Sequence, residues 1–122
     1  MISYSVYKVM HLTGVLMVFF AVGASLMHFI NQGTKIHPWK KFLAITHGIG
    51  ILVALIGGLG LLARLGLVQG LPTWAIVKLV IWTYFAVITA IIPRKPALAK
   101  PLWLLSLVLG SCAAYLAIFK PF

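Results

Sequence analysis

The chain consists of four long apolar stretches separated by short polar connections. The stretches occupy residues 4–30, 41–64, 73–92 and 101–119. Each is close to the ~20 residues that an α-helix needs to cross the hydrocarbon core of a bilayer. The pattern predicts an all-α integral membrane protein, with a single transmembrane domain over residues 1–122 folded as an antiparallel, up-down-up-down four-helix bundle.

The connections carry residues that end or begin helices. Residues 31–33, with the sequence Asn-Gln-Gly, predict the end of the first helix. Thr73 stands at the start of the third apolar stretch and is a candidate N-cap. Prolines at positions 93, 96 and 101 cluster between the last two stretches. They predict a break there, with the fourth helix beginning near Pro101.

The composition supports this assignment and excludes several classes of chemistry. Hydrophobic residues make up 63% of the chain, and its ten charged side chains are all Lys or Arg. Their position near helix ends indicates contact with anionic lipid head groups, and not a nucleic-acid-binding surface. Without Asp or Glu, the chain has no carboxylate pair, no Ser-His-Asp triad and no carboxylate site for Ca²⁺ or Mg²⁺. The single cysteine, Cys112, permits no disulfide within the chain.

The basic residues are distributed unequally between the two faces of the predicted bundle. The face with both termini and the second connection carries Lys8, Arg64 and Lys120. The residues of the other face are Lys35, Lys40, Lys41, Arg94, Lys95 and Lys100. Because positive residues are enriched on the cytoplasmic side of a membrane, we expect the first and third connections in the cytoplasm and both termini outside, in a bacterial inner membrane.

Four polar residues lie inside the predicted spans, where polar groups are costly and mark candidate functional sites. They are His11, His28, His47 and Lys78. His11 and His28 share one face of the first helix but lie ~25 Å apart, so they cannot bind one iron. Antiparallel folding pairs residues of equal depth, which places His11 with Lys78 and His28 with His47. His37, in the first connection, is expected to be an ordinary surface residue.

Histidines flanked by small residues in a helical bundle favour haem. Haem iron accepts axial histidine, and glycine and alanine neighbours leave space for the flat macrocycle. We therefore predict a haem b group, with His11, His28 and His47 as candidate iron ligands. Lys78 is expected to line the cofactor pocket, where its charge needs an anionic partner such as a propionate, or else to extend to the membrane surface. A Cu or Zn site is disfavoured, because no depth offers more than two histidines.

Several short segments resemble the HemJ-type protoporphyrinogen oxidase family, or a related small haem-associated four-span family. They are residues 7–11 (YKVMH), 40–43 (KKFL), 57–62 (GGLGLL) and 74–79 (WAIVKL). The resemblance implies a haem b in a helical bundle, with His11 and Lys78 matching the functional His and Lys of that family. It also implies oxidation of protoporphyrinogen IX, with electrons passed to a membrane acceptor such as a quinone. The chain departs from the family pattern at Met27 and His28, where an arginine is expected.

Two other classes of function are open. A non-catalytic bundle that binds lipid or a partner subunit would have histidines bonded to Ser, Thr or carbonyl groups and no cavity between its helices. A small transporter would relay protons through histidine and would have to form an oligomer, for which a homodimer is the simplest arrangement. A cavity of macrocycle size facing His11 and Lys78, or His28 and His47, would favour haem over both.

Overall fold

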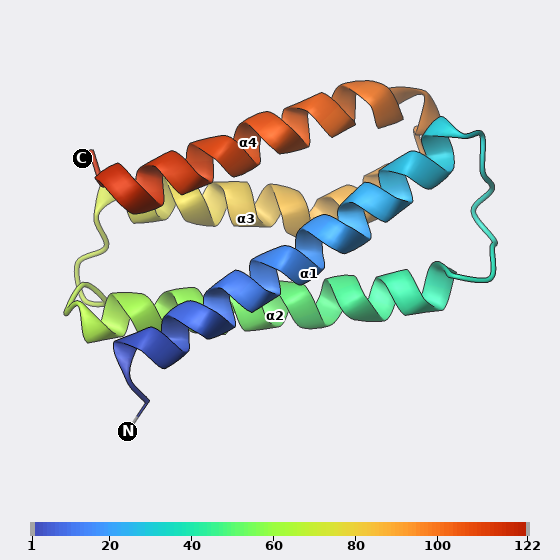
Figure 1. The fold of residues 1–122 in the computed structure, drawn as a ribbon. Coiled ribbons are helices and arrows are strands. Elements are labelled where there is room, and N and C mark those ends of the chain that lie inside the picture. Colours follow the sequence, from blue (N-terminus) through green and yellow to red (C-terminus); the bar gives the residue numbers. More distant parts are fainter. Residues whose placement is uncertain (1, 122) are drawn as a thin grey trace.

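The computed structural model describes residues 2–121 and shows four long helices in that range. They are α1 (Tyr4–Ile30), α2 (Lys40–Arg64), α3 (Thr73–Ile91) and α4 (Ala99–Phe119), with a short 3₁₀ helix, η1 (Pro96–Leu98), before α4. Successive helices run antiparallel (Figure 1). Both ends of the chain and the α2–α3 connection lie at one end of the bundle, here the terminal end, and the other two connections lie at the opposite end. The expected all-α four-helix bundle is confirmed.

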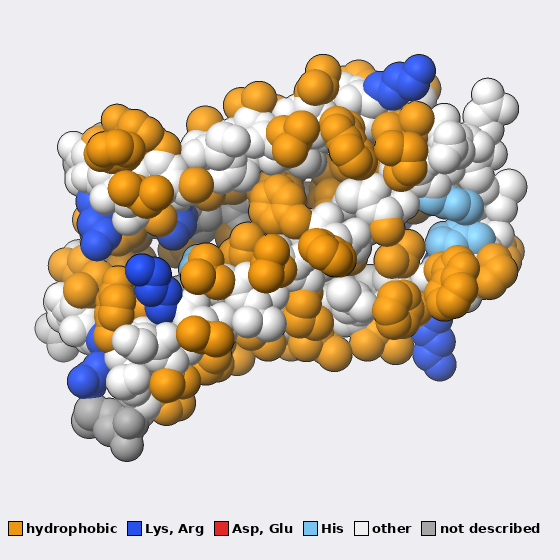
Figure 2. All heavy atoms as spheres, in the orientation of Figure 1, with side chains coloured by type: hydrophobic (Ala, Val, Ile, Leu, Met, Phe, Trp, Pro, Cys, Tyr) orange, Lys and Arg blue, Asp and Glu red, His pale blue; other side chains and the backbone are white. Residues whose placement is uncertain are grey.

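The outer surface of the bundle is apolar along the length of the helices. All four helices are long and apolar enough to cross a membrane. Large side chains point outward from them, such as Phe20, which is 75% exposed, and Ile118, which is 74% exposed. In Figure 2 hydrophobic side chains cover the middle of the molecule, and Lys and Arg gather towards its two ends. This distribution is compatible with an integral membrane protein.

The closest helix packing is between α1 and α2, and small residues make it possible. A methyl group at Gly14 would overlap the backbone of Ala54. One at Gly57 would lie 2.7 Å from the Cα of His11. Small residues at helix contacts let backbones approach closely where lipid provides no hydrophobic driving force. The position of His11 against α2 therefore depends on the absence of a side chain at Gly57.

The starts of α3 and α4 can be compared with the sequence-based expectations. Thr73 is the first residue of α3 and makes no capping bond, because Pro72, with its extended backbone, occupies the N-cap position. The prediction of Thr73 as the cap is therefore wrong. The fourth helix begins at Ala99, two residues before Pro101, in line with the expected start near Pro101. Proline is tolerated in a first helical turn, where its missing N–H has no helical partner in any case.

The densest part of the core lies towards the opposite end of the bundle. The largest fully buried side chains are Val22 and Leu26 in the second half of α1, and Ile88 and Ile92 at the end of α3. The start of α4 closes this region with the buried Ala99. The cavity described below lies at the terminal end.

Candidate functional site

A cavity of about 450 Å³ opens among the four helices at the terminal end. Its size falls within the range of ~300–1,000 Å³ that is usual for ligand pockets in proteins. Most of its wall is apolar, with leucines from α2 and alanines from α3 and α4. Its basic side chains are Lys8, His11, Lys78 and Lys120. Figure 2 shows the corresponding hollow in the surface, with blue side chains around it.

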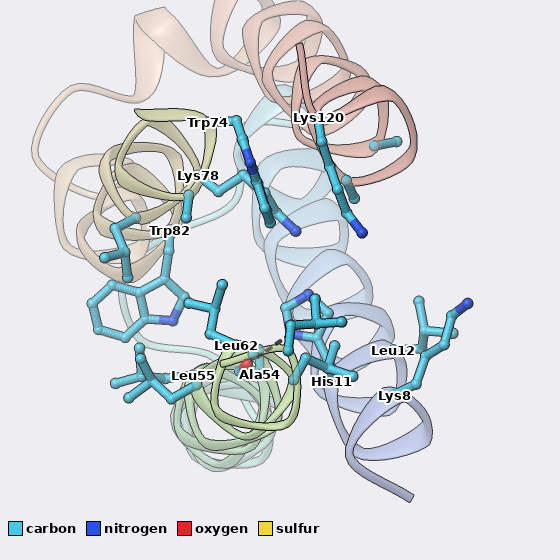
Figure 3. A pocket seen from close by; sticks show the side chains of 18 of the residues that line it. Lys8, His11, Leu12, Ala54, Leu55, Leu62, Trp74, Lys78, Trp82 and Lys120 are labelled. Atoms are coloured by element: carbon cyan, nitrogen blue, oxygen red, sulfur yellow. Dashed lines mark hydrogen bonds between the residues drawn. The ribbon is translucent and has the colours of Figure 1, made fainter. Parts of the chain in front are cut away.

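His11 is fixed at the cavity wall by a hydrogen bond to another helix. Its Nδ1 lies 2.7 Å from the carbonyl oxygen of Ala54 in α2 (Figure 3). Because a carbonyl oxygen only accepts, Nδ1 must carry the proton and donate it. The ring's Nε2 then holds the lone pair. Gly58, whose added methyl would lie 3.2 Å from Nδ1, leaves the ring just enough room beside α2.

One face of α3 forms the wall across from His11. Trp74, Lys78 and Trp82 follow each other at a spacing of four residues and therefore lie on the same side of the helix. The indole nitrogen of Trp82 donates a hydrogen bond to the carbonyl oxygen of Ile51 in α2, at 3.1 Å. This bond ties α3 to α2 beside the cavity. Lys78 is half-buried on this wall, so His11 and Lys78 share one cavity, as the depth argument predicted.

Lys120 reaches the cavity from the end of α4. It is the C-cap of that helix, in a left-handed conformation with φ 47°. Its ammonium nitrogen lies 5.7 Å from the centre of the Trp74 ring, a distance that allows a cation–π interaction. In Figure 3 the side chains of Lys78 and Lys120 both extend towards the space beside His11, and Lys8 lies farther out at the rim.

His47 has a structural environment. It is buried in α2, and its Nε2 donates a hydrogen bond to the carbonyl oxygen of Phe85 in α3, at 2.8 Å. It does not line the cavity that contains His11. The bond joins α2 to α3, and hydrogen bonds of this kind between helices are a common structural role of histidine in membrane proteins.

His28 packs against the first connection, and not against His47 as expected. Its Nε2 donates to the carbonyl oxygen of Thr34, at 2.8 Å, and its ring lies against that of His37 with 4.0 Å between the centres. The connection can fold back because Gln32 takes the left-handed conformation, φ 63°, directly after α1. The equal-depth pairing of His28 with His47 is therefore wrong.

His37 is part of this histidine pair and so is more than an isolated surface residue. Its pKa is lowered from the ordinary value by partial desolvation of the ring, and further by the nearby His28 and Lys40. Within residues 2–121 the structure contains no group of three or more His, Cys, Asp or Glu side chains that could hold a metal ion.

Comparisons of the chain with protein-family models, with curated proteins and with solved structures found no match. A cavity with an imidazole whose Nδ1 is bonded to a carbonyl, an apolar wall and two lysines can hold an apolar molecule that has anionic groups.

Sequence reasoning found His11 and Lys78 and missed three other residues of this cavity. Trp82 lies four residues after Lys78 and Lys8 lies three before His11, so helical spacing alone places each on the same face as a recognised residue. Lys120 follows α4 at the same end of the bundle as Lys8. The sequence does not predict that the Lys120 side chain points into the cavity.

Proposed function

We propose that this protein binds haem b in the cavity at the terminal end and takes part in electron transfer within the membrane. The observation that carries the proposal is His11. It stands at an apolar cavity shared with Lys78, with its Nδ1 proton donated to a backbone carbonyl.

The environment of His11 has the features of a metal-binding histidine. In such histidines one ring nitrogen usually donates to a carbonyl or carboxylate, which fixes the tautomer and leaves the other nitrogen as the ligand. The bond to Ala54 does this for Nδ1, so Nε2 would be the axial ligand of the haem iron. Apolar side chains such as Leu55 and Leu62 would exclude water from the macrocycle. The haem would supply one-electron redox chemistry, and the protein would set its position and surroundings.

The proposal includes the location of the site. With the basic first and third connections in the cytoplasm, the terminal end faces outward from a bacterial inner membrane. The cavity then lies in the outer half of the bilayer, where a quinone can reach it as electron partner. Oxidation of protoporphyrinogen IX, which the resemblance implies, is a further prediction. Its assay is the rise of porphyrin fluorescence when protoporphyrinogen IX and a quinone are added to the purified protein.

The visible absorption spectrum of the detergent-purified protein, oxidised and dithionite-reduced, tests haem binding. We expect a Soret band that is lost or strongly weakened in His11→Ala and restored when imidazole is added to that variant. His28→Ala is the matched control, because His28 packs against the first connection and not in the cavity. Its spectrum should equal that of the wild type. A protein that stays colourless after addition of hemin, or a Soret band indifferent to His11→Ala, would contradict the proposal.

A further inference from the structure

The lysines at the mouth of the cavity form a second feature that axial ligation does not use. We infer that Lys78 and Lys120 are an anion subsite that binds the two carboxylates of a tetrapyrrole, with Lys8 adding positive charge at the rim. This inference rests on the proposed function for the identity of the ligand. It adds which end of the ligand faces outward and which side chains hold it.

The two lysines come from different elements and meet at one place. Lys78 belongs to the second turn of α3, and Lys120 caps the end of α4. Both line the cavity, and in Figure 3 their side chains extend towards the same space. Trp74 stands beside Lys120, with 5.7 Å from the ammonium nitrogen to the ring centre, and limits the directions in which that side chain can point. Two ammonium groups are thus held near each other at the mouth.

The chain itself offers no acidic side chain to neutralise this pair. None of its 122 residues is Asp or Glu, and the net charge is +10. Two neighbouring ammonium groups repel each other, and placing one inside a membrane span is costly. An anion from outside the chain removes both penalties, because charge-assisted hydrogen bonds between ammonium and carboxylate are among the strong ones. The arrangement therefore favours a ligand that brings its own negative charge.

The apolar lining of the cavity restricts the choice of ligand further. Behind the lysines the wall is apolar, with Leu55 and Leu62 from α2 and the indole of Trp82 from α3 (Figure 3). A molecule that fits both the apolar wall and the two lysines has an apolar body with more than one anionic group at the same edge. A tetrapyrrole with two propionates has this form. A fatty acid, with a single carboxylate, would leave one ammonium group without a partner.

Metal-free protoporphyrin IX separates this subsite from iron ligation. Its binding to the purified protein is measured by fluorescence, in parallel with its dimethyl ester, which keeps the macrocycle and loses both charges. We expect the diacid to bind at least about tenfold more tightly than the ester, since one hydrogen bond to a charged group is worth about that factor. Lys78→Gln and Lys120→Gln should each remove much of this preference, and Lys8→Gln less. Lys100→Gln, an exposed lysine outside the cavity, is the matched control and should leave the preference unchanged.

The outcomes distinguish the subsite from the proposed function. Equal binding of diacid and ester, or a preference that survives in the Lys78→Gln and Lys120→Gln double variant, would overturn the subsite even if the Soret band depends on His11. A charge preference that persists in His11→Ala would support the subsite even if the protein fails to ligate haem iron. Displacement of the diacid by phosphatidylglycerol vesicles, with no displacement by neutral vesicles, would overturn the choice of tetrapyrrole in favour of an anionic lipid. Circular dichroism melts in detergent show that each variant is folded.

Discussion

At the scale of single residues, the three histidines of the helices all use a ring N–H to reach a backbone carbonyl. His11 bonds to Ala54, His28 to Thr34 and His47 to Phe85, at 2.7 Å, 2.8 Å and 2.8 Å. His11 donates through Nδ1 and the other two through Nε2, and the surroundings of the remaining ring nitrogen differ as well. For His11 they include a cavity, so the three residues should respond differently to substitution.

Replacement of His47 tests the structural interpretation of that residue. His47→Leu removes the hydrogen bond to Phe85 and keeps an apolar side chain of moderate size. We expect the free energy of unfolding in detergent to fall by about 0.6 kcal/mol, the average for hydrogen bonds between membrane helices, and by no more than about 1.7 kcal/mol. The Soret band should stay. A variant of unchanged stability that has lost the Soret band would show that His47 is an iron ligand.

The sequence predicted part of this site for a clear physical reason. Antiparallel helices bring residues of equal depth together, and this was sufficient to place His11 with Lys78. The same argument failed for His28, because it assumes that the chain continues along the helix axis beyond the end of α1. The turn at Gln32 instead brings His37 onto the His28 ring. Local backbone conformation of this kind is not visible in hydrophobic periodicity.

At the scale of helices, the contact between α1 and α2 holds His11 in position. Hydropathy predicts both helices, and the run of small residues in α2 predicts that something packs closely against it. It does not identify the partner helix or the crossing point. The structure shows that Gly57 meets the backbone of α1 at His11, so the fit of the helices and the geometry of the site depend on the same atoms.

Substitution of Gly57 should therefore disturb stability and ligand binding together. An added methyl at Gly57 would lie 2.7 Å from the His11 Cα, and the helices must separate to accept it. We expect Gly57→Ala to reduce the free energy of unfolding by about 1–3 kcal/mol and to weaken the Soret band. Gly48→Ala in the same helix is the control, since a methyl there meets nothing within 4 Å. If both variants melt at the same temperature in detergent, close packing at Gly57 is not a source of stability.

At the scale of the whole molecule, the two ends of the bundle differ in how their side chains pack. Tight packing of Leu26, Ile88 and Ile92 closes the end with the first and third connections, and the cavity occupies the terminal end. The alternation of apolar stretches predicts the order of the helices. The offset of the core towards one end depends on how side chains interlock, which composition and spacing do not specify.

The orientation of this asymmetric bundle in the membrane is testable with cysteines. In a Cys112→Ser background, Lys35→Cys labels the first connection and Gly70→Cys labels the second. We expect a membrane-impermeant maleimide added to intact cells to react with Gly70→Cys and to reach Lys35→Cys only after the cells are opened. The reverse pattern would place the cavity in the cytoplasmic half of the bilayer.

The arrangement of the helices also determines the route by which a ligand can reach the cavity. As far as residues 2–121 show, α1 packs against each of the other three helices, while α2 and α4 do not pack against each other. The hollow that Figure 2 shows opens on the lateral surface of the bundle. A hydrophobic ligand dissolved in the bilayer can therefore enter sideways without passing through water. Occupancy should then follow the number of ligand molecules per lipid, and diluting the membranes in buffer should leave it unchanged.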